Sequence, residues 1–180
     1  VFVESFESPR IVQIGNDGAT FEIKEGETFA ATAGDGNNAI TGTGNLKIVS
    51  GTMKLQKSFA SSGSMTIDKG AKVEVETGTL SAFVENLEET AGVNVNGTIE
   101  FLSSGMLYRS FAGNGVVAVK GDVAINNTGN NGKLTGLSRF KGSVIVDEGK
   151  TLTLTYWNNG YNIVLSELEV NGSVIGNKGN

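Results

Sequence analysis

The sequence predicts an all-β fold, arranged as a β-solenoid of about seven coils. Three observations support this class. One strand–turn–strand unit recurs in near-identical form, shorter versions of the unit follow at intervals of 19 to 28 residues, and the 180 residues include 26 glycines but a single proline. Repeats of roughly 20 to 30 residues are typical of stacked coils, and many short alternating segments separated by turns are typical of all-β chains.

The clearest unit is Gly63–Val75, GSMTIDKGAKVEV. Its apolar residues alternate with polar ones on both sides of a turn, which Gly70 favours because glycine tolerates positive φ. Near-copies of this unit are Ala19–Ala31 (ATFEIKEGETFAA) and Gly142–Leu154 (GSVIVDEGKTLTL). The turns of the three units differ in their charged residues but keep the glycine, so we interpret the unit as a structural corner.

One or two strands are expected within Val1–Ile14. After them, each unit is located by the start of its first alternating strand. These starts are Phe21, Leu46, Met65, Val93, Val117, Val144 and Leu168. Two alternatives remain open at this point. A propeller would require the units to be grouped in pairs, and antiparallel hairpins would use the same Asn-Gly turns. The variable loop after each pair of strands favours the solenoid.

One segment, Leu80–Thr90, departs from the pattern. Leu80, Phe83, Val84 and Leu87 have the spacing of one helix face, which predicts either one short helix near residues 80–90 or an irregular strand.

Composition excludes several functions. The chain has no histidine and no cysteine, so histidine-based and cysteine-based catalysis and the usual zinc sites are ruled out. Its net charge is −5 and its 14 lysines and arginines are scattered, which argues against nucleic-acid partners and membrane insertion. We expect no cofactor and no metal site. The acidic candidates are interpreted as solvated surface: Glu85, Glu88 and Glu89, and Asp35 beside Asn37 and Asn38.

The candidate ligand-binding residues are Tyr156, Trp157, Asn159 and Tyr161, which combine aromatic rings with an amide. Rings of this kind stack on sugars and apolar protein surfaces, while amides bond hydroxyl groups. The alternative interpretation is an aromatic plug over the edge of a coil. Tyr108 and Phe111 form a second, weaker candidate patch.

Two stretches carry a family resemblance: GTGNLKIVSGTMKL (Gly42–Leu55) and GLSRFKGSVIVDEGKTLTL (Gly136–Leu154). They resemble the passenger-domain repeats of bacterial autotransporter (type V secreted) proteins, and the likeness covers about two thirds of the chain, from Ala19 onward. It implies a right-handed parallel β-helix displayed outside the cell on the bacterial surface. We therefore expect residues 1–180 to be a single β-solenoid segment of a longer surface protein.

The leading functional hypothesis is a non-enzymatic adhesin or structural passenger segment that presents loops for host or cell–cell contact. Its expected partner is a host or bacterial cell-surface protein or glycan, and self-association is a further hypothesis. The alternative is a polysaccharide-acting β-helix enzyme or a phage tail-fibre-like depolymerase module, which would need carboxylates converging on one groove.

Overall fold

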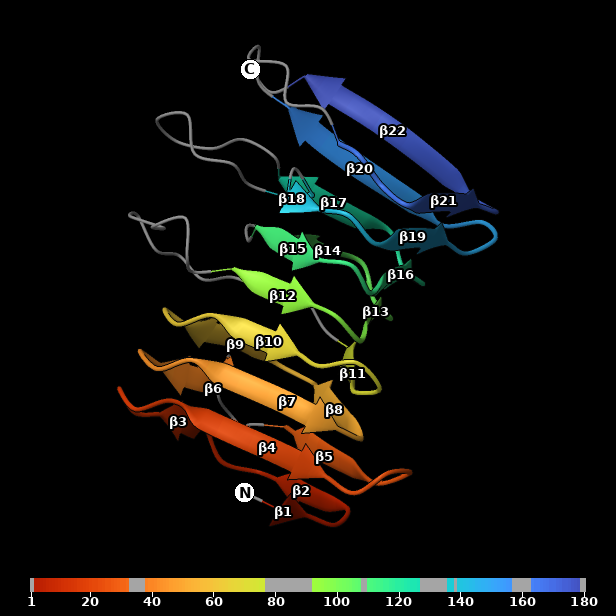
Figure 1. Cartoon of the computed structure of the whole chain (residues 1–180). Coiled ribbons are helices and arrows are strands. Elements are labelled where there is room, and N and C mark those ends of the chain that lie inside the picture. Colours follow the sequence, from red (N-terminus) through yellow and green to blue (C-terminus); the bar gives the residue numbers. More distant parts are fainter. Residues whose placement is uncertain are drawn as a thin grey trace.

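The chain forms a stack of parallel β-coils that runs from the N-terminal end to the C-terminal end (Figure 1). The computed structural model describes residues 2–32, 38–76, 92–107, 110–126, 136–137, 139–156 and 163–178. Within these ranges there are 22 strands and no helix. The strand pairings described are parallel throughout, which confirms the predicted β-solenoid and excludes an antiparallel hairpin array over these residues.

The strands belong to four sheets. Sheet A consists, in spatial order, of β1 (Phe2–Val3), β4 (Ala19–Ile23), β7 (Leu46–Ser50), β10 (Met65–Ile67), β12 (Val93–Val95), β15 (Phe111–Gly113) and β18 (Arg139–Phe140). Sheet B consists of β2 (Phe6–Ser8), β5 (Thr28–Ala31), β8 (Thr52–Leu55), β11 (Lys72–Val75), β13 (Thr98–Phe101), β16 (Val116–Val119), β19 (Ser143–Val146) and β21 (Glu167–Val170).

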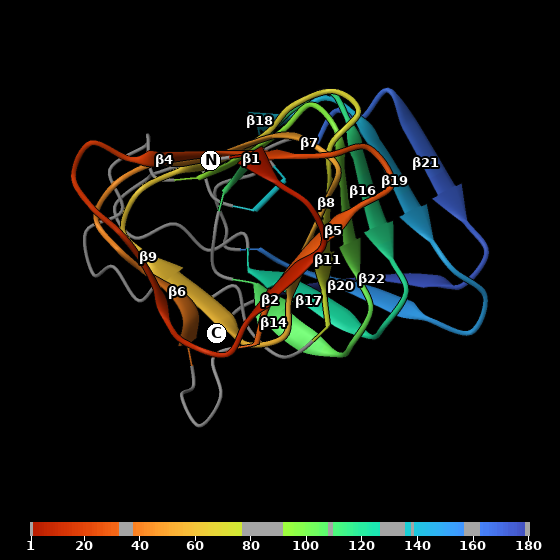
Figure 2. The ribbon, with the colours of Figure 1, turned by 90° about the horizontal axis from the view of Figure 1, so that it is seen from below.

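Two smaller sheets complete the coils. Sheet C consists of β3 (Val12–Ile14), β6 (Asn38–Gly42) and β9 (Ser58–Ser61) in the N-terminal half. Sheet D consists of β14 (Gly105–Leu107), β17 (Val123–Asn126), β20 (Thr151–Tyr156) and β22 (Ser173–Lys178) in the C-terminal half. Viewed along the stack, sheet A and sheet B lie on adjoining sides, and the chain turns a corner between them in each coil (Figure 2).

The register shows how long each coil is. On sheet A, Met65 pairs with Val93, 28 residues later, and Val93 pairs with Phe111, 18 residues later. On sheet B, Ile99 pairs with Val117 and Val117 pairs with Val144. The strands therefore stay in register although the loops between them vary in length.

The solenoid has about five turns, slightly fewer than the seven coils expected. The first four predicted starts, Phe21 to Val93, lie on sheet A, but the last three, Val117 to Leu168, lie on sheet B. The predicted series of unit starts therefore passes from sheet A to sheet B after Val93. It does so because it misses β15 and β18, which are short and lack alternation, as the letters FAG and RF show.

The recurring unit is a corner with one turn geometry. Its turn glycine has a φ of 80° at Gly26, 89° at Gly70 and 69° at Gly149. The residue after each glycine donates its backbone N–H to the carbonyl three residues earlier, at 2.9 to 3.1 Å. Positive φ at the third position with this bond is the type II arrangement, which favours glycine. The first two copies join sheet A to sheet B, whereas the third joins sheet B to sheet D.

The interior is filled by rows of apolar side chains that run along the stack. In sheet B one row passes through Met53, Val73, Ile99, Val117 and Val144, which the register places side by side. These five side chains are fully buried. Adjacent strands lie about 4.8 Å apart, and complete burial stabilises the fold by about 1.5 to 3 kcal/mol for each such side chain.

The aromatic residues of the core extend these rows. The rings of Phe101 and Phe111 meet edge to face, with centroids 6.2 Å apart. Phe111 is completely buried, so its assignment to a surface patch was wrong: it is the first residue of β15 and points inward. Its proposed neighbour Tyr108 lies outside the described residues, as does the helix predicted near 80–90.

Between β12 and β13, we expect Gly97 to be required by close approach of the backbone of the preceding coil. A Cβ atom on Gly97 would lie 2.2 Å from the carbonyl oxygen of Ala71, whereas nothing lies within 4 Å of a Cβ on Gly15. Gly97→Ala should therefore lower the free energy of unfolding by more than about 2 kcal/mol, because the backbone of two coils must separate. Gly15→Ala should change it by less than about 0.5 kcal/mol. Urea denaturation measures both, and equal effects of the two substitutions would contradict the close stacking of corners.

Candidate functional site

The outward face of sheet A carries a row of residues from four successive strands. Thr66 pairs with Asn94, Asn94 with Ala112, and Ala112 with Arg139. Their neighbours in sequence point inward: Met65, Ile67, Val93 and Phe111 are buried. Because side chains alternate along a strand, these four residues must face away from the core.

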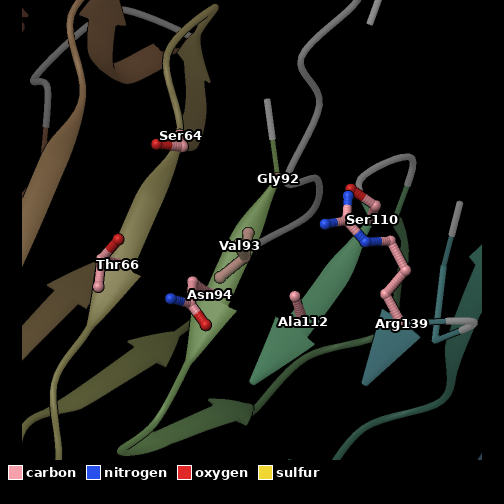
Figure 3. A pocket seen from close by; sticks show the side chains of 8 residues that line it. All are labelled: Ser64, Thr66, Gly92, Val93, Asn94, Ser110, Ala112 and Arg139. Carbon is pink, nitrogen blue, oxygen red and sulfur yellow. The ribbon is translucent and has the colours of Figure 1, made fainter. Parts of the chain in front are cut away.

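A groove of about 390 Å³ lies along this row. Its lining combines small and polar residues from β10, β12, β15, β18 and the segments that lead into them (Figure 3): Ser64, Thr66, Gly92, Val93, Asn94, Ser110, Ala112 and Arg139. Its volume is in the range of small-molecule sites. Ala112 makes the hollow, because its methyl group stands between the longer side chains of Asn94 and Arg139.

Gly92, just before β12, and Ser64, just before β10, border the groove. A Cβ atom on Gly92 would lie 2.6 Å from the hydroxyl oxygen of Ser110, so any side chain at position 92 would displace that residue. The hydroxyl group of Ser64 donates to Oδ1 of Asn45 at 3.0 Å, and its backbone N–H donates to the same oxygen at 3.0 Å. Ser64 is therefore held in place and presents its remaining lone pairs.

The lining defines what the groove can bind. Hydroxyl groups and one amide can both donate and accept hydrogen bonds, and Arg139 adds a guanidinium that donates only. The eight lining residues include no carboxylate. The arrangement fits a ligand rich in hydroxyl groups, or one with a carboxylate, which arginine can bind through two parallel hydrogen bonds. Over the described residues, no group of three or more Asp and Glu side chains could hold a metal ion.

Charged residues gather instead on the outward face of sheet B. Lys54 lies 3.3 Å from Glu74 and 3.5 Å from Glu76, measured from Nζ to the nearest carboxylate oxygen. Lys72 lies 2.5 Å from Glu74 and 3.8 Å from Glu100. We call these residues, together with Lys120 at 3.2 Å from Glu100, the charge ladder. In this register Lys54 lies directly opposite Glu74, which favours the pairing. Glu74 also lies directly opposite Glu100, and the lysines beside these two carboxylates offset their repulsion.

The ladder shifts the pKa of its central members. Burial acts to raise the pKa of Glu74, but hydrogen bonds and charge from Lys72 and then Lys54 outweigh it, and the pKa falls below its ordinary 4.5. The pKa of Lys54 rises above 10.5, chiefly through the hydrogen bond to Glu74 and the charge of that carboxylate. The hydrogen bond to Glu74 is also the largest cause that raises the pKa of Lys72.

The predicted ligand-binding residues fall largely outside the description. Tyr156 is the last residue of β20 in sheet D, which fixes its backbone. Trp157, Asn159 and Tyr161 lie outside the described residues, as do the acidic candidates Asp35, Glu85, Glu88 and Glu89. Of these four residues the structure therefore places Tyr156 alone, in sheet D, whereas the strand residues that line the groove belong to sheet A.

Sequence reasoning missed the groove. Thr66 and Asn94 are the central residues of MTI and VNV, so their outward direction follows from alternation. Ala112 and Arg139 could not be aligned with them, because β15 and β18 were not recognised as strands of the same sheet.

Comparison with known proteins identified no relative: no family model, no curated protein and no solved structure matches the chain. None of the described residues forms a helix long and apolar enough to cross a membrane.

The charge ladder predicts a specific dependence of stability on pH. The contribution of Glu74 is present above pH 4.5 and is lost as the pH falls through its lowered pKa. The contributions of Lys54 and Lys72 are present below pH 10.5 and are lost as the pH rises through their raised pKa values.

Glu74→Gln should therefore reduce the free energy of unfolding by about 1 kcal/mol at neutral pH. The difference from the unsubstituted chain should shrink below pH 4.5, where Glu74 itself becomes protonated. Glu22→Gln, an exposed carboxylate on sheet A, is the control and should have almost no effect. Urea denaturation at several pH values measures this, and a constant deficit down to pH 2 would show that the ladder charge is not the cause.

Proposed function

We propose that this chain is a non-enzymatic segment of a rod displayed outside the cell on a bacterial surface, where it contacts proteins or glycans. The single observation that carries the proposal is the outward groove on sheet A, lined by hydroxyl, amide and guanidinium groups on a scaffold of stacked coils. The scaffold fixes the groove, because Thr66, Asn94, Ala112 and Arg139 extend from strands whose other residues include buried ones of the core.

Two features support the link with surface passenger domains. The first is the likeness of the repeats at Gly42–Leu55 and Gly136–Leu154 to autotransporter repeats. The second is the direction of winding: with the N-terminal end toward the viewer, β4, β5 and β6 follow one another clockwise as the chain recedes (Figure 2). That direction is right-handed, as in the family that the repeats resemble.

The charge of the groove favours acidic partners. The chain carries a net charge of −5, yet the only charged group among the lining residues of this groove is the guanidinium of Arg139. A glycan with carboxylate groups, or an acidic protein segment, would place its anion there and its hydroxyl groups near Thr66 and Asn94. Tyr156, Trp157, Asn159 and Tyr161 are proposed as a second contact region, of which Tyr156 ends β20 of sheet D.

Arg139→Ala should weaken binding to carboxylate-bearing oligosaccharides by about tenfold, because a charged bidentate bond is lost. Lys47→Ala is the matched control. It removes one positive charge from the same sheet, and Lys47 does not line the groove. Binding of the purified chain to an array of neutral and uronic-acid oligosaccharides measures both variants.

Equal losses in the two variants would indicate general electrostatic attraction and would contradict binding in the groove.

The triple variant Tyr156→Ala, Trp157→Ala, Tyr161→Ala should lower binding independently of Arg139, and unchanged binding would refute the second contact region. Release of reducing sugar from any polysaccharide on the array would contradict the non-enzymatic role and favour the polysaccharide-acting alternative.

A further inference from the structure

The backbone along the groove of sheet A takes part in the hydrogen bonds of the sheet. Strands β10, β12 and β15 each pair with a strand on both sides. The carbonyl oxygens of Gly92 and Ser110 accept hydrogen bonds from the backbone N–H groups of Met65 and Val93, at 2.9 and 2.8 Å. A peptide that binds to a sheet gains its affinity from backbone hydrogen bonds at a free strand edge. These three strands offer no such edge, so a ligand in the groove must be recognised through side chains.

The two ends of the groove make opposite demands on a ligand. At one end, the backbone N–H of Ser64 donates to Oδ1 of Asn45 at 3.0 Å, and the hydroxyl group of Ser64 donates its single hydrogen to the same atom at 3.0 Å. The hydroxyl oxygen of Ser64 can therefore only accept, so the ligand must supply a donor such as a hydroxyl group. At the other end, the guanidinium of Arg139 only donates, and a carboxylate is the acceptor that fits it best.

The separation of these two ends sets the length of the ligand. Ser64 directly precedes β10, and Arg139 begins β18, three strands further along sheet A. Adjacent strands lie about 4.8 Å apart, so the two ends are about 14 Å apart, measured across the strands. One sugar ring is too short to reach both ends. A sugar ring with its glycosidic linkage is about as long as one step between strands, so a linear chain of three units matches the groove.

Between the two ends lie two positions at which the groove has no long side chain. Gly92 directly precedes β12, and Ala112 is the middle residue of β15. The hydroxyl oxygen of Ser110 lies beside Gly92, where a Cβ atom would be 2.6 Å away from it, and Asn94 is the strand partner of Ala112 (Figure 3). Sugar rings at these two positions would lie beside a hydroxyl group and an amide, which both donate and accept hydrogen bonds.

We propose that the groove binds a linear oligosaccharide of three sugar units that lies along the rod, with a carboxylate at the Arg139 end and hydroxyl groups at the Ser64 end. This proposal rests on the function proposed above and selects the glycan over the acidic protein segment, because the groove offers a peptide no backbone partners at β10, β12 and β15. The orientation is fixed, because the reverse placement would set a carboxylate against an oxygen of Ser64 that can only accept.

The probes are gluconate and the acids obtained by oxidising the reducing ends of cellobiose, cellotriose and cellotetraose. They carry one terminal carboxylate on one, two, three or four sugar units. NMR titration of the full chain should show an affinity that rises by about tenfold from gluconate to the three-unit acid, with no further gain for the four-unit acid. Cellotriose, which has the same length but no carboxylate, should bind about tenfold more weakly than the three-unit acid.

Two substitutions at opposite ends of the groove should respond differently to ligand length. Ser64→Ala should weaken binding of the three-unit acid by about fivefold and leave gluconate unchanged, because one unit at Arg139 does not reach Ser64. Arg139→Ala should weaken binding of all four acids. Ser62→Ala is the matched control: it removes a hydroxyl group two residues from Ser64 that does not line the groove, and it should change none of the affinities.

The outcomes separate this inference from the function on which it rests. Equal affinity for acids of every length, with Arg139 still required, would overturn the proposed length and orientation but leave a carboxylate site in the groove. Binding of tetraglutamate as tightly as the three-unit acid would overturn the choice of a glycan. If none of the acids binds, or if Arg139→Ala changes no affinity, the inference fails together with the groove as the contact site of the proposed function.

Discussion

One coil of this chain cannot cover its own apolar side chains, and every other feature depends on that constraint. Ile99 is fully buried, with Val73 on one side of it and Val117 on the other, both from neighbouring coils. Stability in such arrays is the sum of contacts between neighbours. Strands must therefore stay in register even though the chain between Val93 and Phe111 is ten residues shorter than between Met65 and Val93.

The same constraint separates the two sides of each strand. Inward positions must be apolar and corners must allow the backbones of neighbouring coils to approach closely, as Gly97 does beside Ala71. Outward positions need not be apolar, so the residues found there can differ from one sheet to another. Sheet B uses them for the charge ladder, which stabilises the register, and sheet A uses them for the groove that ends at Arg139.

Alternation, turn glycines and spacing were enough to predict the solenoid from the sequence. The conformation of the turn at Gly70 depends on neighbouring residues, so it could be predicted from the sequence. The same turn, however, joins sheet A to sheet B at Gly70 and sheet B to sheet D at Gly149. The position of a unit within its coil could therefore not be predicted from its similarity to another unit. The groove depends on Asn94 and Arg139 being two strands apart, which is a property of register over 45 residues and not of any local pattern. Phe111 was misplaced because a three-residue strand gives too little alternation to show its inward direction.

The most direct test of the stacked parallel register is disulfide formation between outward residues of neighbouring coils, in a chain that has no cysteine of its own. Thr98 and Val116 are partners on adjacent strands, about 4.8 Å apart, which is within the distance a disulfide spans. Cysteines at these two positions should cross-link readily on oxidation and leave the fold intact. Cysteines at Thr98 and Ser143, two strands apart, should not. Failure of the first pair, or equal cross-linking of both pairs, would contradict the stacking of coils on which the account rests.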